Sequence, residues 1–423
     1  MLKDFRDPKE FPRPFWVLMG ATFIDRIGFF LLLPYFALYV TQRFGLEMTA
    51  LGGVFFVFAF SGTIGSFVGG AIADKFGRRR IILFGLVFSA ASSLLLGFAG
   101  EFSLFVILTL FVGLLQDVGG PAQSALVADV LPSRRHSEGF GIWRVVANLA
   151  AVIGPLLGGF LAHRNYLYLF IGDATLSFLT ALVVYFALHE TKPQPKEGQA
   201  PQSFLQTAAG YRKVLGNRVF MTFILIAIFG VMMYAQIDTS LPVFLRDVHN
   251  MPPQYYGYLL ALNASMVVLL QFWITRKMKG YAPLILMAIG TLFLAVGFAM
   301  YGFGAGLLYF AVVMAIITIG EMIIAPTGQA LAARLAPETM RGRYMAMFAF
   351  SWSFPFAIGP VFAGLIIDHV DFYWVWYASG IVGIMCVLGY LALNARAGAG
   401  LGKMDDEVLQ VTAPVGAPSP TPG

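Results

Sequence analysis

The sequence predicts an all-α polytopic membrane protein, with twelve transmembrane helices arranged as two parallel six-helix repeats. Three observations predict this fold: an apolar composition, apolar stretches of spanning length, and an internal repeat. The 423 residues are 58% hydrophobic and only 12% charged, whereas soluble domains carry about 25% charged residues. A helix satisfies its own backbone hydrogen bonds, and about twenty residues cross the hydrocarbon core. Apolar stretches of this length between short polar loops therefore predict spanning helices.

The apolar stretches fall into two sets of six. The first set is expected at Phe15–Val40, Thr49–Ala73, Ile81–Ala99, Ser103–Val130, Gly139–Ala162 and Leu167–Leu188. The second set is expected at Val219–Val248, Tyr255–Thr275, Leu284–Tyr301, Leu307–Leu335, Tyr344–Ile367 and Phe372–Leu393. These sets predict an N-terminal bundle over residues 1–190, a cytoplasmic linker over 191–217 and a C-terminal bundle over 218–394. The remaining residues, 395–423, are rich in Gly, Ala and Pro, which is typical of a disordered tail.

The positive charges are biased to one side of the predicted bundle. Of the 28 Lys and Arg residues, 23 lie in the terminal segments and the loops of one face, and the opposite face holds only Arg43, Arg164 and Arg246. The positive-inside rule then predicts that both termini are cytoplasmic. This topology accounts for the net charge of +6 without a nucleic-acid partner. The polar segment Met1–Pro14, followed by a full-length apolar stretch, is unlike a cleavable signal.

An internal repeat relates the two sets at an offset of 205 residues. Pro121, Ala125, Leu126, Ala128 and Pro132 align with Pro326, Ala330, Leu331, Ala333 and Pro337, and Ile153, Gly154, Pro155 and Gly159 align with Ile358, Gly359, Pro360 and Gly364. Because an offset of six spans preserves direction, the halves are parallel repeats related by an axis along the membrane normal.

The loop between spans 2 and 3 carries a specific motif. It reads Gly70-Ala-Ile-Ala-Asp74-Lys-Phe-Gly77-Arg78-Arg-Arg, and it resembles the G-x-x-x-D-[RK]-x-G-R-[RK] signature of the major facilitator superfamily. Gly77 permits a tight turn. Asp74 ends span 2, where a carboxylate opposes the helix dipole, so we expect it to serve another partner.

The resemblance implies a gating latch at this loop. In the family the motif Asp lies by the start of span 11 and joins a charge relay with the loop Arg and an acid at the end of span 4. The matching residues are Arg78 and Asp129, with Arg341 near span 11 as a further partner. The corresponding loop of the second half, Arg276–Gly280, has no acid. We therefore expect an asymmetric latch that holds the halves together on the cytoplasmic side.

Span 5 carries a second motif of small residues. Gly141, Gly154, Pro155, Gly158 and Gly159 resemble the motif of the drug:proton antiporters, with Ala150 where glycine is usual. Pro155 removes one helical hydrogen bond and favours a kink. The glycines provide a flat face for close helix packing, and packing of small residues is the alternative interpretation of the pattern.

Ionisable residues inside membrane spans are costly and are functional candidates. In the superfamily, spans 1, 4, 7 and 10 line the central cavity, and these spans carry Asp25, Asp117, Asp238 and Glu321. Arg26, Arg144 and Asn148 are further cavity candidates, with Asp117 and Arg144 able to pair across neighbouring helices.

The intramembrane charged residues are expected to face different surroundings: the cavity, a neighbouring helix or water. Asp25 and Arg26 lie about 100° apart on a helix, so we expect one to face the cavity and the other a neighbouring helix. Asp173 and Asp238 lie closer to the external ends and are expected to reach water.

The intramembrane charges do not balance. Five acids (Asp25, Asp117, Asp173, Asp238 and Glu321) face two arginines in the spans, so at most two acids can pair one-to-one. Burial favours the neutral form of a carboxyl group. The unpaired acids therefore favour a proton-coupled mechanism.

No enzyme motif accompanies these features. The single cysteine, Cys386, excludes an intrachain disulfide and a cysteine-based metal site. No phosphate-binding loop or zinc-protease pattern occurs, and the five histidines lie mostly in loops. We expect no enzymatic activity, no cofactor and no metal.

The leading hypothesis is a monomeric, proton-driven antiporter of a bacterial inner membrane that exports hydrophobic or cationic drug-like compounds. Its expected partners are a small-molecule substrate, protons and the lipid bilayer. The alternative is a transporter of a polar metabolite, sugar or lipid-linked headgroup, with Arg26 and Arg144 as anchors. The residue pattern leaves the substrate, the direction and the coupling stoichiometry open.

Overall fold

The computed structural model describes residues 11–116, 119–132, 135–188, 190, 211–337 and 340–397. For residues 66–76, 116, 119–121, 124, 125, 128, 136 and 137, it describes the backbone alone. The regular structure in these ranges is helical, and eleven helices are long and apolar enough to cross a membrane. A shorter apolar helix, Phe102–Leu115, accompanies them. The predicted all-α membrane fold is confirmed.

The helices of the first half follow the predicted order. They are α1 (Arg13–Leu32), the 3₁₀ turn η2 (Leu33–Tyr35), α2 (Phe36–Phe44), α3 (Met48–Phe76), α4 (Arg78–Phe98), α5 (Phe102–Gln116), α6 (Gly119–Val130), α7 (His136–Arg164) and α8 (Leu167–Ala187). The first predicted span is thus interrupted at Pro34, because proline lacks the N–H that a continuous helix uses.

The second half repeats the arrangement. Its helices are α10 (Arg218–Tyr234), α11 (Gln236–Asp247), α12 (Pro253–Lys277), α13 (Pro283–Met300), α14 (Leu307–Leu335), α15 (Arg341–His369) and α16 (Phe372–Ala397). The predicted seventh span is interrupted at Ala235. The Gln236 amide donates to the Met232 carbonyl at 2.9 Å and accepts from the Ser240 hydroxyl at 2.7 Å. Polar side chains therefore supply hydrogen bonds at the interruption, as a broken membrane helix requires.

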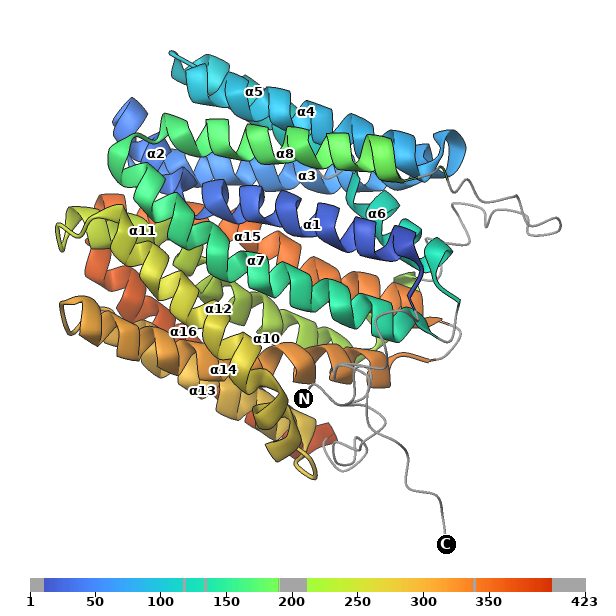
Figure 1. Ribbon diagram of the computed structural model, residues 1–423. Helices are drawn as coiled ribbons and strands as arrows, with labels where there is room; N and C mark the ends of the chain where they lie inside the picture. Colours follow the sequence, from blue (N-terminus) through green and yellow to red (C-terminus); the bar gives the residue numbers. More distant parts are fainter. Residues whose placement is uncertain are drawn as a thin grey trace, which may run out of the picture.

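The two halves lie side by side and meet along two helix pairs. Figure 1 shows the blue-to-green first half beside the yellow-to-red second half. Helix α3 packs on α15, and α7 packs on α12. We call the end where α1 begins and α16 ends the near end, and the opposite end the far end. Arg43, Arg164 and Arg246 all lie at the far end, in the last turns of α2, α7 and α11.

The apolar cores divide differently at the two ends. One cluster joins both halves at the far end, and it includes Phe36 and Phe105 of the first half with Phe244, Phe310 and Trp376 of the second. At the near end, the described residues form one cluster within the first half and others within the second. The halves therefore share a core at the far end and have separate cores at the near end.

The small residues of span 5 let α7 approach α1 closely. A Cβ added at Gly154 would lie 2.6 Å from Phe30 Cβ, and one at Gly158 would lie 2.6 Å from Tyr35 Cε2. The Tyr35 hydroxyl donates to the Pro155 carbonyl at 2.6 Å. Gly159 instead faces the second half, because its added Cβ would lie 2.9 Å from Gln254 Cα. Ala150 is fully buried on the same helix.

We predict that Gly154→Ala lowers the thermal stability of the detergent-solubilised protein. The added methyl overpacks the contact with Phe30, which costs about 1–3 kcal/mol, more than alanine gains in helix propensity, about 1 kcal/mol. Gly20→Ala is the matched control, because an added Cβ there meets nothing within 4 Å. Equal melting temperatures for the two variants would contradict the prediction.

Candidate functional site

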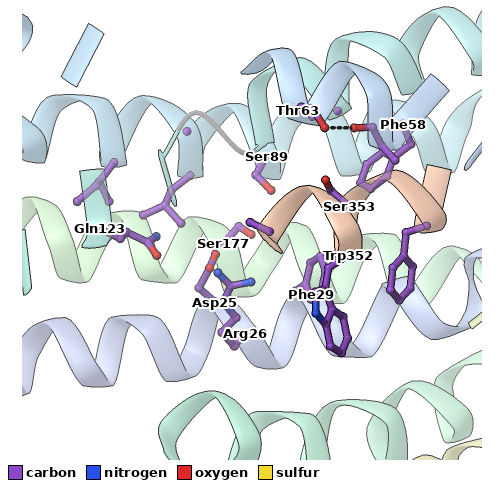
Figure 2. A pocket seen from close by; sticks show the side chains of 18 of the residues that line it. Asp25, Arg26, Phe29, Phe58, Thr63, Ser89, Gln123, Ser177, Trp352 and Ser353 are labelled. Carbon is purple, nitrogen blue, oxygen red and sulfur yellow. Dashed lines mark hydrogen bonds between the residues drawn. The ribbon is translucent and has the colours of Figure 1, made fainter. Parts of the chain in front are cut away.

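A cavity of about 810 Å³ lies between the halves. Its first-half wall contains most of the polar groups, including Asp25, Arg26, Ser89, Asp173 and Ser177. Its second-half wall comes mainly from α15 and is largely apolar, with Met345, Phe348, Trp352 and Phe356. In Figure 2, Asp25, Arg26 and Ser177 cluster on one side, while Trp352 and Ser353 enter from the opposite half. The charged groups therefore lie on the first-half wall, whereas aromatic rings come from both walls: Phe29 and Phe58 from the first half, and Phe348, Trp352 and Phe356 from the second.

Two carboxylates come together on the polar wall because α1 and α8 pack closely. A Cβ added at Gly28 would lie 2.8 Å from the Asp173 Oδ1, so only glycine fits this contact. Asp173 is 4% exposed and accepts a hydrogen bond from the Ser93 hydroxyl of α4. The expectation that Asp173 reaches water at the external end is therefore not met, because its buried side chain borders the cavity between the halves.

Asp25 and Arg26 both line the cavity, which corrects the expectation that only one of them would face it. The cavity is wide enough to include two adjacent positions of α1. The Arg26 guanidinium also lies 5.6 Å from the centre of the Phe29 ring, a cation–π arrangement that orients it.

Glu321 lies in a separate small pocket of about 30 Å³. Asn263 Nδ2 donates to Glu321 Oε2 at 2.8 Å and to Thr318 Oγ1 at 3.0 Å. Phe348 and Trp352 line both this pocket and the large cavity. These two rings therefore separate Glu321 from the wall that holds Asp25, a division that the sequence did not predict.

The remaining cavity candidates are placed as follows. Asp238 lies on α11, close enough to Glu321 to interact electrostatically, and it is not among the described residues that line either space. Arg144 Nη2 donates across the halves to Gln329 Oε1 at 3.4 Å, and Gln329 lines the large cavity. Asn148 lies one turn after Arg144 on α7. Asp117 lies outside the described residues, so its pairing with Arg144 stays a prediction.

The structure brings two of the latch candidates together. Arg78 Nε lies 2.8 Å from Asp129 Oδ2, and their side chains are 9% and 30% exposed. The pair joins the start of α4 to the end of α6. Arg341 begins α15 at the same end of the bundle. Gly70 and Asp74 belong to α3, and their side chains lie outside the described residues. The gating role of this set stays a prediction.

Glu190 is a functional candidate that the sequence reasoning missed. Its carboxylate accepts hydrogen bonds from the backbone N–H groups of Arg79, at 3.2 Å, and Arg80, at 3.3 Å. It thereby caps α4, since the first N–H groups of a helix lack partners and attract negative charge. Gly77 makes room for it: an added Cβ would lie 2.5 Å from Glu190 Cδ, and the backbone has φ of +101°. In the sequence, the only indication of this cap was an acid close to the end of predicted span 6.

The chain matches one protein family over most of its length. The model of the Major Facilitator Superfamily matches residues 18–327 and 281–414. The chain belongs to this superfamily. It is a multi-pass membrane transporter, and its relatives and structural neighbours are transporters rather than enzymes.

Two characterised relatives resemble most of the chain. A Na(+), Li(+), K(+)/H(+) antiporter of Planococcus maritimus is 28% identical over 382 residues, which cover 84% of this chain and 89% of the relative. The quinolone resistance protein NorA of Staphylococcus aureus is 26% identical over 361 residues, which cover 84% of this chain and 90% of the relative. Its relatives therefore include a named cation/proton antiporter and a named quinolone resistance protein.

Solved structures share the fold at lower identity. A mutant of the nucleoside transporter NupG has a TM-score of 0.77 at 14% identity, covering 90% of this chain and 99% of that one. A peptide transporter POT in complex with sulfate has a TM-score of 0.76 at 17% identity, covering 94% and 97%. At these identities the likeness concerns the fold alone.

We predict that Arg78 and Asp129 are energetically coupled. Asp129→Asn leaves the largely buried Arg78 charge without this carboxylate, which should cost about 1–3 kcal/mol of stability. A double-mutant cycle with Arg78→Gln, read by thermal unfolding, should give a coupling energy of about 0.5–3 kcal/mol. Additive single and double effects would show that the pair contributes nothing as a pair.

We predict that Trp352 shields Glu321 from the large cavity. In a Cys386→Ala background, a Glu321→Cys reporter should react slowly with a polar thiol reagent, because the pocket admits little more than one water. Adding Trp352→Ala should raise the rate by about tenfold, as an opened path increases the reactive population. Phe356→Ala is the control, since Phe356 lines only the large cavity. An equal increase in the control would refute the shielding role.

Proposed function

We propose that the protein is a proton-coupled antiporter that exports hydrophobic or cationic drug-like compounds by alternating access. The single observation that carries this proposal is the divided cavity, with carboxylates on the first-half wall and aromatic rings on the second-half wall. A lipophilic cation would place its charge toward Asp25 and Asp173 and its rings against Trp352 and Phe348. Aromatic rings attract cations through their π faces, and methionine adapts to varied apolar shapes.

The proton would be carried by carboxyl groups enclosed among helices. Glu321 is held by Asn263 and lies behind the Phe348–Trp352 partition, while Asp25 and Asp173 line the substrate cavity. A carboxyl group in surroundings of low polarity can exist in the protonated form, and its charge changes when water or a cation arrives. In this proposal Glu321 binds the proton, and the cavity acids Asp25 and Asp173 bind the substrate.

The arrangement of the cores supports alternating access. A shared core at the far end and separate cores at the near end describe a transporter that opens toward the near end. The bias of Lys and Arg toward the near end favours a cytoplasmic location for it, in a plasma membrane. Substrate would then enter a monomeric transporter from the cytoplasm. The proposed latch residues Arg78 and Asp129 lie at the same end.

We predict that Glu321→Gln abolishes proton-driven transport and leaves substrate binding intact. In proteoliposomes with an imposed proton gradient, accumulation of a lipophilic fluorescent cation should fall by about tenfold or more, since the amide cannot exchange a proton. Glu101→Gln is the control, because Glu101 is exposed between α4 and α5. Gradient-driven accumulation at the wild-type rate in Glu321→Gln would overturn the assignment.

A second candidate is exchange of alkali cations for protons. The observation that favours it is the pair of Asp25 and Asp173 beside the Ser93 hydroxyl, since carboxylate and hydroxyl oxygens are ligands for hard cations. The relative from Planococcus maritimus carries an antiporter name of this kind. The same proteoliposomes separate the candidates: proton release driven by Na⁺, Li⁺ or K⁺ and lost in Asp173→Asn favours cation exchange, while release driven only by the lipophilic cation favours drug export.

A further inference from the structure

An acid of the second half caps a helix of the first half at the far end. Asp368, in the last turn of α15, accepts hydrogen bonds from the backbone N–H groups of Met48, at 2.9 Å, and Thr49, at 2.7 Å. These residues begin α3, where N–H groups have no partner within the helix. A carboxylate at this position also interacts favourably with the helix dipole. The two halves are thus joined by two charge-assisted hydrogen bonds between segments more than 300 residues apart.

Backbone contact holds this cap in place. A Cβ added at Gly52 would lie 2.6 Å from Val361 Cα, and one added at Gly364 would lie 2.5 Å from the Met48 carbonyl carbon. Helices α3 and α15 therefore touch directly beside the cap, on the side toward the middle of the bundle. The carboxylate can reach the two N–H groups only while these backbones stay together.

Arg246 makes a second polar connection at the same end. Its Nη1 donates to the Leu38 carbonyl at 3.1 Å and to Thr41 Oγ1 at 3.0 Å, both on α2. The neighbouring Asp247 holds the guanidinium in position, with an Nε–Oδ1 distance of 2.5 Å. Hydrogen bonds from a charged donor are stronger than those between neutral groups. The second half thus places an acid on the start of α3 and a cation against α2, both in the first half.

The internal repeat allows the α3–α15 junction to be compared with its equivalent in the other pair of helices. By the 205-residue offset, Gly52 and Gly364 correspond to Gly257 and Gly159 at the junction of α12 with α7. That junction keeps the close contacts: an added Cβ at Gly257 would lie 2.6 Å from the Pro155 carbonyl oxygen.

The polar members of the cap have no such counterparts. The same offset places His163 at the position of Asp368 and Pro253 at the position of Met48. The first replacement removes the carboxylate, and the second removes one of the two N–H donors, since proline has none. Both junctions retain the glycine packing, and the α3–α15 junction alone has this acid and donor pair.

We infer that Asp368 and Arg246 are gating residues of the transport cycle, which hold the far end closed and release it when the transporter changes its open side. Opening the far end must separate the shared core, and this motion breaks both connections together. The gate acts through alternating access, and it does not depend on the substrate or the coupled ion proposed above.

Accessibility of the far-end core tests this inference. In a Cys386→Ala background, Leu241→Cys places a reporter at a fully buried position of the shared core. In nanodiscs, Asp368→Asn and Asp368→Ala should each raise its labelling rate by about tenfold, through a shifted population of far-end-open molecules. Asp368→Glu should restore slow labelling, and His163→Ala, at the equivalent position of the other junction, should change nothing. Unchanged labelling in Asp368→Ala with an unchanged melting temperature would overturn the gate.

A disulfide lock provides the second measurement. With Thr49→Cys and Asp368→Cys in the Cys386→Ala background, oxidation should hold the far end closed and stop transport of any substrate found, while reduction should restore transport. Transport by fully oxidised protein would contradict the gate. Because labelling requires neither substrate nor proton gradient, an altered labelling rate without drug transport would reject the proposed function and leave the gate standing.

Discussion

The structure depends on one constraint: in hydrocarbon, each backbone N–H and C=O must find its partner within the protein. This constraint makes the described regular structure helical, and it determines how the helices can be interrupted. At Ala235 the side chain of Gln236 supplies bonds that the helix loses, and at Pro34 a 3₁₀ turn carries the chain into α2. At the ends of the bundle, acids from other elements satisfy the first N–H groups of two helices: Glu190 caps α4 and Asp368 caps α3.

The same constraint separates rigid from movable parts of the bundle. Glycines bring backbones into contact at Gly52, Gly154 and Gly257, so these junctions can slide or tilt with little side-chain rearrangement. Charged contacts such as Arg78–Asp129 and Arg246–Leu38 are directional, so each favours one relative position of the helices that it joins. Thr41 and Arg246 are equivalent residues of the two repeats, and their contact therefore lies at the axis that relates the halves. A contact at this axis senses the rotation of one half against the other.

Much of the fold follows from the sequence, because apolar length and the 205-residue repeat act over whole helices. The sequence also pointed to Arg78 and Asp129, which the motif resemblance named together and the structure places 2.8 Å apart. It could not reveal that Trp352 and Phe348 separate Glu321 from Asp25, because this depends on how α14 and α15 rotate about their axes. It also undervalued Asp173, since burial by α1 and α4 arises from tertiary packing at Gly28 and Ser93.

Glu190 has a mechanical consequence. The residues that connect the two halves begin immediately after it, and its carboxylate is fastened to the N–H groups of Arg79 and Arg80. Any pull on the connecting chain therefore acts on the start of α4 before it reaches the end of α8. That start of α4 also carries Arg78 and its ion pair with Asp129. The covalent connection between the halves is thus anchored beside the predicted latch, where tension from a moving second half would act on the Arg78–Asp129 ion pair.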